Sequence, residues 1–229
     1  MVCACAERRL LDQELLDRAL RGDGVTVVQD LCACAAHRDP LLREFARQPS
    51  PKVFACHPRA VRALFVQSGA PLSDDVEIVN IGKVSGDTPD NPRPVRGWPP
   101  WFPVIDKQRC INCGQCLDFC LFGVYEKDES GQVRVVNPSN CKNNCPACAR
   151  ICPEAAIIFP KCGEPPINGA EIDDAVAVRA NIKLNIDEML GDDVYGALNA
   201  RKQKRRHLLD EKKIEKALAE RDRWETNRE

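Results

Sequence analysis

Two cysteine-rich stretches, CINCGQCLDFC at residues 110–120 and CKNNCPACARICP at residues 141–153, hold eight of the 14 cysteines in this 229-residue chain. Close spacing of this kind, with a proline after the last cysteine, is typical of the ligands of 4Fe-4S clusters. A tight loop reaches three corners of such a cube but not the fourth, so each run needs a ligand from outside itself. The eight cysteines are Cys110, Cys113, Cys116 and Cys120 in the first run, and Cys141, Cys145, Cys148 and Cys152 in the second.

The runs and their surroundings at residues 104–159 resemble the bacterial-type dicluster (2×4Fe-4S) ferredoxin family, in which each run gives three ligands to one cluster and one ligand to the other. The resemblance implies an α+β dicluster ferredoxin domain at residues 104–168 with two 4Fe-4S clusters. It also implies two crossed ligand sets. The first set is Cys110, Cys113, Cys116 and Cys152, and the second set is Cys141, Cys145, Cys148 and Cys120.

Three features depart from the pattern of that family. The second run has three residues, KNN at 142–144, where the family has two, and Leu121 follows Cys120 in place of a proline. The runs are also separated by a longer insertion. Its residues 123–136 contain two apolar segments around a Glu-Ser-Gly turn, which predicts a β-hairpin that the ferredoxin fold can accommodate.

Other roles for these eight cysteines fit the spacing less well. Zinc sites usually pair two short knuckles rather than two runs of four cysteines. Disulfides need a geometry that cysteines three positions apart on one loop rarely reach. The first residues carry charge at Glu7, Arg8 and Arg9 where a signal peptide has an apolar run, and no stretch of 18 apolar residues exists. We therefore expect a soluble, cytoplasmic protein with no membrane span. Its net charge of −1 indicates no class of partner.

The first 82 residues alternate between segments typical of strands and segments typical of helices. Short β-branched or apolar segments predict four strands, and apolar residues at helical spacing, with proline starts and a glycine stop, predict three helices. Alternation of this kind predicts an α/β domain with a small parallel sheet. The strands are expected at residues 2–5, 25–28, 52–55 and 76–81, and the helices at residues 10–20, 40–46 and 58–68.

Five more cysteines lie where three of these strands end. Cys3 and Cys5 end the first strand, Cys32 and Cys34 follow the second, and Cys56 follows the third. The carboxyl ends of parallel strands share one edge of the sheet, which is where such folds bind ligands. We therefore expect these thiols to converge at a metal or redox site.

The same segment resembles the N-terminal domain of the flavin-bearing (A-type) subunit family of heterodisulfide reductase. The resemblance rests on VCAC at residues 2–5, RDP at residues 38–40, VFACHPR at residues 53–59 and Asn80-Ile81. It implies a third 4Fe-4S cluster, held by Cys3, Cys5, Cys56 and either Cys32 or Cys34. A cysteine that the family carries after its Asn-Ile stretch is absent, because residues 80–91 contain none. No G-x-G-x-x-G fingerprint follows a strand, so we expect no flavin or nucleotide site.

The rest of the chain has two expected parts, a linker and a C-terminal arm. Residues 83–103 are rich in proline and glycine and predict an extended linker. Residues 169–229 predict a helical charged arm, and from residue 201 onward acidic residues interleave with basic ones, which favours a partner protein over nucleic acid. Apolar residues near the clusters are expected to exclude water. They are Ile105, Ile111, Phe119, Leu121, Phe122, Ile151, Ile157, Ile158 and Phe159.

These features predict an electron carrier rather than an enzyme. Single electrons would pass through two 4Fe-4S clusters, joined by the third, to or from a flavin- or metal-containing oxidoreductase. Two alternatives stay open. In one, Cys3-Ala4-Cys5 and Cys32-Ala33-Cys34 act as redox dithiols or sulfur carriers. In the other, the chain is an iron-sulfur regulatory protein that binds nucleic acid through its basic tail.

Overall fold

The structure is a computed structural model that describes residues 1–172 except residues 23, 84–87, 89–92 and 96. The chain divides into two units, Met1–Lys183 and Leu184–Glu229. All of the described residues belong to the first unit. The predicted helices of the C-terminal arm, from residue 175 onward, lie outside the described residues.

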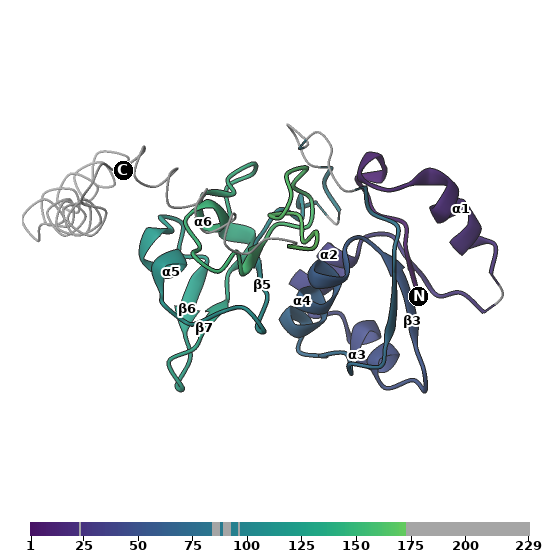
Figure 1. Cartoon of the computed structure of the whole chain (residues 1–229), viewed down its shortest axis with the longest axis horizontal. Helices are drawn as coiled ribbons and strands as arrows, with labels where there is room; N and C mark the ends of the chain where they lie inside the picture. Colours follow the sequence, from purple (N-terminus) through teal and green to yellow (C-terminus); the bar gives the residue numbers. More distant parts are fainter. Residues whose placement is uncertain (23, 84–87, 89–92, 96, 173–229) are drawn as a thin grey trace, which may run out of the picture. The chain divides into compact units, whose positions relative to one another are not determined.

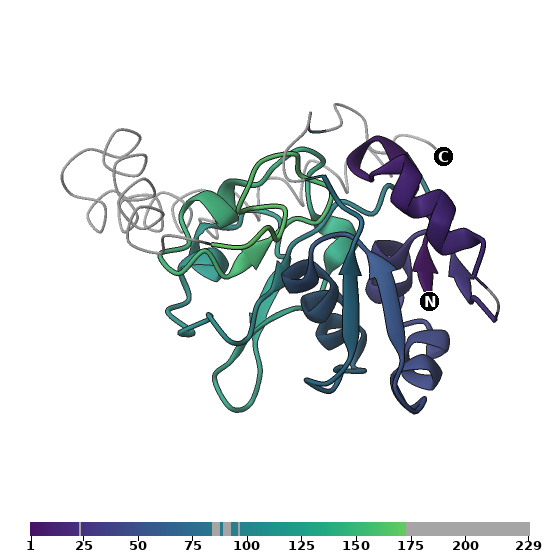
Figure 2. The same ribbon diagram turned by 45° about the vertical axis from the view of Figure 1, so that its right-hand side comes forward.

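A parallel sheet forms the N-terminal part of this unit, as the sequence predicts. Its order is β2-β1-β3-β4, and every neighbouring pair of strands is parallel. Val2 pairs with Val27 on one side and with Phe54 on the other, so β1 is a central strand. Figure 2 shows the sheet with its N-terminal strand inside it. The strands are β1 at Val2–Cys3, β2 at Val27–Val28, β3 at Lys52–Ala55 and β4 at Glu77–Asn80.

Helices cover both faces of this sheet (Figure 1). The helix after β1, α1 at Gln13–Leu20, packs Leu16 and Ala19 against Val2 on one face. The other three helices lie on the opposite face, where Cys3 and Val53 point into the main core. This change of side follows from right-handed crossovers that run first one way and then the other along the sheet. Those helices are α2 at Leu31–Ala36, α3 at Pro40–Ala46 and α4 at Pro58–Ser68.

Aspartate side chains start three of these helices, and a glycine ends the fourth. The side chains of Asp12, Asp30 and Asp39 accept hydrogen bonds from backbone N–H groups in the first turns of α1, α2 and α3. Gly69 ends α4 in the left-handed conformation with φ of 78°. Two predictions need correction. The expected helix at residues 10–20 begins only at Gln13, after a 3-10 turn at Arg8–Leu10, and Asp30 starts a helix, α2, that was not predicted from the sequence.

The ferredoxin part is built from short elements. Strand β5 at Val104–Ile105 pairs antiparallel with β8 at Ile157–Ile158, which brings the start and end of the cysteine region together. The predicted hairpin is present, with Tyr125 opposite Val135 and a turn at residues 128–131. Its strands are β6 at Tyr125–Lys127 and β7 at Val133–Val135; the remaining elements are α5 at Gln115–Phe119, a 3-10 turn at Pro138–Asn140 and α6 at Ala147–Arg150.

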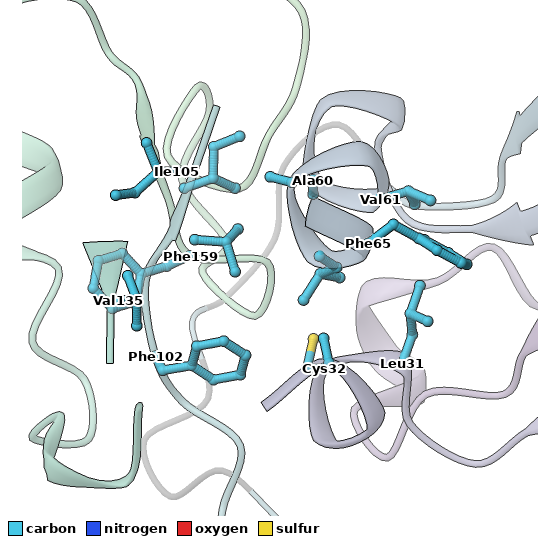
Figure 3. Packing of buried hydrophobic residues seen from close by; sticks show 14 of the residues in the cluster. Leu31, Cys32, Ala60, Val61, Phe65, Phe102, Ile105, Val135 and Phe159 are labelled. Carbon is cyan, nitrogen blue, oxygen red and sulfur yellow. The ribbon is translucent and has the colours of Figure 1, made fainter. Parts of the chain in front are cut away.

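One hydrophobic core runs through both parts of the unit. Figure 3 shows Phe102, Ile105 and Phe159 on one side of this core, and Cys32 and Ala60 on the other. Between β4 and β5, the described residues form no strand or helix, apart from an isolated bridge between Val95 and Trp98.

Tryptophans and an arginine fasten the two parts together. Trp101 in the linker segment is fully buried, and its ring is tilted by 32° against that of Phe159 at a centroid distance of 5.5 Å. Trp98 lies at an edge-on distance of 5.9 Å from His37. The Arg59 guanidinium of α4 binds Asp106 beyond β5. Trp98 and Trp101, both among the described linker residues, are therefore packing anchors.

Candidate iron-sulfur centres

Left-handed backbone conformations curl the two cysteine runs into tight loops. Asn112 and Gly114 in the first run have φ of 55° and 81°, and Asn144 in the second run has φ of 57°. Asparagine and glycine adopt this conformation at least cost. The Asn112 side chain also accepts a hydrogen bond from the backbone N–H of Val133, which fastens the first loop to β7. Each loop then enters one turn of helix, α5 or α6.

The first predicted set of thiols gathers in the ferredoxin part. Burial raises the pKa of Cys116 to about 12, and the nearby charges of Cys152, Cys110 and Cys113 contribute to this rise. The backbone N–H of Ala156 donates to the Cys152 sulfur at 3.3 Å. Cys116 is buried, whereas Cys113 is exposed to solvent. The first run and Cys152 of the second run therefore share one site.

The second predicted set is crossed in the same way. Burial raises the pKa of Cys141 to about 12, followed by the charges of Cys145 and Cys120. Burial also raises the pKa of Cys148, and the charges of Cys141 and Cys120 add to this rise. Cys120, at the end of the first run, thus lies with the cysteines of the second run. The extra residue at 142–144 does not prevent this gathering.

A hydrogen bond from a tyrosine belongs to the second set. The hydroxyl of Tyr125 in β6 lies 3.1 Å from the Cys148 sulfur, and both side chains are buried. This contact offsets part of the effect of burial, but the pKa of the Cys148 thiol stays raised. The hairpin that carries Tyr125 was predicted from the sequence, but this contact was not, because no spacing rule links the two residues.

Among the described residues, no three His, Cys, Asp or Glu side chains gather closely enough to share one metal ion. A 4Fe-4S cube takes one thiolate per iron, so its four cysteines stand apart around the cube. A zinc ion instead draws four ligands to one point, with Zn–S distances of about 2.3 Å.

Four of the five N-terminal thiols also come together. Cys3 hydrogen-bonds to Cys5, which raises the pKa of Cys3 and lowers the pKa of Cys5. Burial raises the pKa of Cys56 to about 12, and the charge of Cys5 adds to this shift. Burial raises the pKa of Cys32 on α2, and the charges of Cys56 and Cys5 add to this rise. We call Cys3, Cys5, Cys32 and Cys56 the N-terminal thiol group.

This group lies where the topology predicts a ligand. In the order β2-β1-β3-β4, the chain passes from β1 to β2 on one side and then continues to β3 on the other side of β1. The point where the strand order reverses therefore lies between β1 and β3. Ligands of open α/β sheets bind outside the carboxyl ends of the strands at this point. Cys3 and Cys5 follow β1 and Cys56 follows β3.

The structure distinguishes Cys32 from Cys34. Cys32 is buried within the N-terminal thiol group, whereas Cys34 is half-buried and lines a cavity of about 670 Å³ beside Cys5 and Asp30. Cys162, the last cysteine, is buried elsewhere, with its sulfur 3.7 Å from the Thr88 hydroxyl.

A buried ion pair, which no sequence motif indicates, lies beside the N-terminal thiol group. Lys161 lies shortly after β8 in the ferredoxin part, yet its ammonium is 2.5 Å from the Asp30 carboxylate and 3.9 Å from the Cys5 sulfur. Both charged side chains are almost fully buried, with exposed fractions of 2% and 1%. The other Asp30 oxygen caps α2.

The apolar surroundings agree only in part with expectation. Buried residues of the predicted set include Ile105, Ile151 and Phe159. Three others are exposed, so the prediction that they exclude water is wrong: Ile111 is 62% exposed, Leu121 66% and Phe122 40%. Ile111 lies within the curled first run, and Leu121 and Phe122 follow directly after it, where the tight loop leaves their side chains toward solvent.

Comparison with known proteins identifies the central region. A family model for a 4Fe-4S dicluster domain matches residues 102–153. Two uncharacterized ferredoxins of Methanocaldococcus jannaschii are similar to this chain. One is 51% identical over 61 residues, which are 26% of this chain and 41% of the relative. The other is 39% identical over 58 residues, which are 24% of this chain and 74% of the relative.

A subunit of a pyruvate synthase is also similar. The pyruvate synthase subunit PorD of Methanothermobacter marburgensis is 35% identical over 60 residues, which are 26% of this chain and 67% of that relative. No solved structure matches the chain. The chain belongs to the 4Fe-4S dicluster ferredoxin family, whose members carry two iron-sulfur clusters and transport electrons. None of the helices in the described residues is long and apolar enough to cross a membrane.

Proposed function

We propose that this chain is a three-cluster relay, which passes single electrons to or from an oxidoreductase and carries out no chemistry on a substrate. The observation that carries the proposal is the gathering of 12 cysteines into three groups within one folded unit. Its proposed parts are an α/β cysteine-bearing domain at residues 1–82, a linker at 83–103, the ferredoxin domain at 104–168 and an arm at 169–229. We place its action in the cytoplasm.

Two ligand sets are proposed for the ferredoxin domain. Cys110, Cys113, Cys116 and Cys152 would hold one cluster, and Cys141, Cys145, Cys148 and Cys120 the other. The mutual charge effects within each set support this division. Burial of Cys116 and Cys148 favours metal-bound sulfur, because an unpaired thiolate in an apolar site is unstable.

The N-terminal thiol group is proposed to hold the third cluster. The site lies at the switch point of the sheet, and the resemblance of this segment to the flavin-bearing subunit family of heterodisulfide reductase points to the same cysteines. We assign Cys32 rather than Cys34 as the fourth ligand, since Cys32 lies among the other three. The backbone N–H of Leu31 at 3.4 Å from the Cys3 sulfur would help to hold that thiolate.

The proposed partner is an oxidoreductase, bound either permanently or transiently. Similarity to a pyruvate synthase subunit supports a place in such a complex. Because the sequence has no flavin fingerprint, flavin or metal chemistry would belong to the partner, and the C-terminal arm would contribute to docking.

Iron and acid-labile sulfide per chain test the proposal, together with low-temperature EPR of the dithionite-reduced protein, all measured anaerobically. We expect about 12 irons, and about eight in Cys56→Ser. Cys34→Ser is the matched control, from the same domain but outside the proposed ligand set, and should keep about 12. About eight irons in the unmodified protein would remove the third cluster from the proposal.

A second candidate function is thiol chemistry at the N-terminal group. It is favoured by the lowered pKa of Cys5, caused first by the hydrogen bond from Cys3, and by the cavity that Cys5 and Cys34 line. Anaerobic alkylation separates the two functions. Three bound clusters would leave only Cys34 and Cys162 unligated, whereas two clusters would leave Cys5 open to rapid alkylation.

A further inference from the structure

Lys161 brings a positive charge from the ferredoxin part into the N-terminal thiol group. It is separated from Asp30 by 131 positions in the sequence, yet the two form a buried ion pair. The Lys161 ammonium is also the donor to the Cys5 sulfur at 3.9 Å. No side chain of the N-terminal domain supplies a comparable buried cation to this group among the described residues.

The surroundings keep this side chain charged. Burial alone would favour the neutral amine, but the Asp30 carboxylate, 2.5 Å away and equally buried, favours the charged ammonium. Asp30 in turn has a fixed place, because one of its oxygens caps α2 and the other also accepts from the backbone N–H of Ala6. The ammonium is therefore held in position beside the thiols.

The charge of a cluster site decides how readily it accepts an electron. A cube on four thiolates is negative overall and becomes more negative by one charge on reduction, so a fixed cation nearby favours the reduced form. A carboxylate at the same distance disfavours the reduced form. In a buried site, these effects are screened little by water.

We propose that Lys161 and Asp30 set the reduction potential of the N-terminal cluster in opposite directions, with Lys161 raising it and Asp30 lowering it. The inference rests on the proposed third cluster. One electron from the donor protein enters the site and no covalent bond changes. Because Lys161 belongs to the ferredoxin part, the N-terminal site has its full charge environment only when both parts are packed together.

Two single substitutions test this by redox titration followed by EPR. Lys161→Met removes the charge while keeping a long side chain, and we expect a lower potential for the N-terminal cluster. Asp30→Asn keeps a good helix cap, and we expect a higher potential. Each shift should be about tenfold in the ratio of reduced to oxidised cluster at a given potential, or about 59 mV for one electron. Lys161→Arg should restore most of the potential lost in Lys161→Met.

The signals of the two ferredoxin clusters serve as internal controls and should not move. A merely structural ion pair predicts losses of the same kind in both variants, so shifts of the same sign, or no shift, would overturn the inference. If Lys161→Met fails to keep its third cluster, the upward shift in Asp30→Asn decides alone. About eight irons in the unmodified protein would instead reject the third cluster, and this inference with it, before any titration.

Discussion

The Tyr125 hydroxyl donates a hydrogen bond to the Cys148 sulfur across 3.1 Å, inside the apolar core of the ferredoxin part. Hydrogen bonds to ligand sulfur stabilise the added negative charge of a reduced cluster. The hairpin between the two cysteine runs therefore supplies a hydrogen-bond donor to the second cluster site.

Tyr125→Phe removes this donor and keeps the ring. We expect the potential of the cluster on the second set to fall by tens of mV, on the order expected for one hydrogen bond whose strength differs between the two redox states. Redox titration with EPR detection measures the shift. The cluster on the first set is the control in the same sample, and an equal fall in both potentials would show a general loosening instead.

Arg59 fastens the two parts of the unit. Its guanidinium donates to Asp106 at 3.0 Å and to the carbonyls of Ala155 and Ala170, both at 2.9 Å. The Arg59 and Asp106 side chains are largely buried, with exposed fractions of 17% and 11%. Arg59→Met should lower the free energy of unfolding by about 3–5 kcal/mol, because Asp106 keeps a buried charge without its cation.

Arg150 offers a matched control for that substitution. Its pair with Glu164 has a similar distance, 3.0 Å, but both side chains are about half exposed. Arg150→Met should lower the free energy of unfolding by no more than about 1 kcal/mol. Anaerobic denaturant titration of both variants makes the comparison. Equal losses would show that Arg59 does not join the parts.

Gly169 packs directly on α4. A Cβ at this position would lie 2.7 Å from the Ala60 Cβ, and the backbone has φ of 92°. Gly169→Ala should destabilise the chain by about 1–3 kcal/mol for overpacking, in addition to about 1–2 kcal/mol for the backbone conformation.

Gly131 separates those two contributions. It also has a positive φ, of 78°, but nothing lies within 4 Å of its added Cβ. Gly131→Ala should therefore lose only the part that comes from the backbone. Thermal unfolding of the two variants under identical cluster loading would measure the difference, and equal melting temperatures would argue against the close packing at Ala60.

Removal of iron should affect the two parts unequally. The cysteine region contains only short elements, such as the four-residue α6 and the two-residue β8, so ligation supplies much of its folding free energy. After anaerobic chelation, we expect amide hydrogen exchange protection to be lost at residues 110–153 and retained in β3 and α4. Loss of protection in all of these elements at once would mean that the unit unfolds cooperatively.

Most features that follow from local pattern could be predicted from the sequence. Four strands, the hairpin and the gathering of cysteines at one edge of a parallel sheet were all expected, because strand order and thiol spacing leave a clear periodic or positional signal. Helix α2 was missed because its short apolar segment, LCACAA, has no polar face to show a helical period.

The missed parts of the site depend on contacts between distant segments. Lys161 follows Pro160 in a turn and pairs with Asp30, 131 positions earlier in the sequence, so neither residue stands out alone. Ile111, Leu121 and Phe122 were expected to cover the clusters because they are apolar. Their exposure follows from the tight loops, which commit the inward positions to cysteine.

Cys113 is the exposed cysteine among the 14. Its corner of the first site is consequently open to solvent and to dissolved oxygen, and thiolate sulfur that reaches solvent is the kind that oxidises first. Damage in air should therefore begin at Cys113, while the buried Cys148 and the N-terminal thiols stay intact for longer. Exposure to air would then affect the cluster on the first set before it affects the other sites.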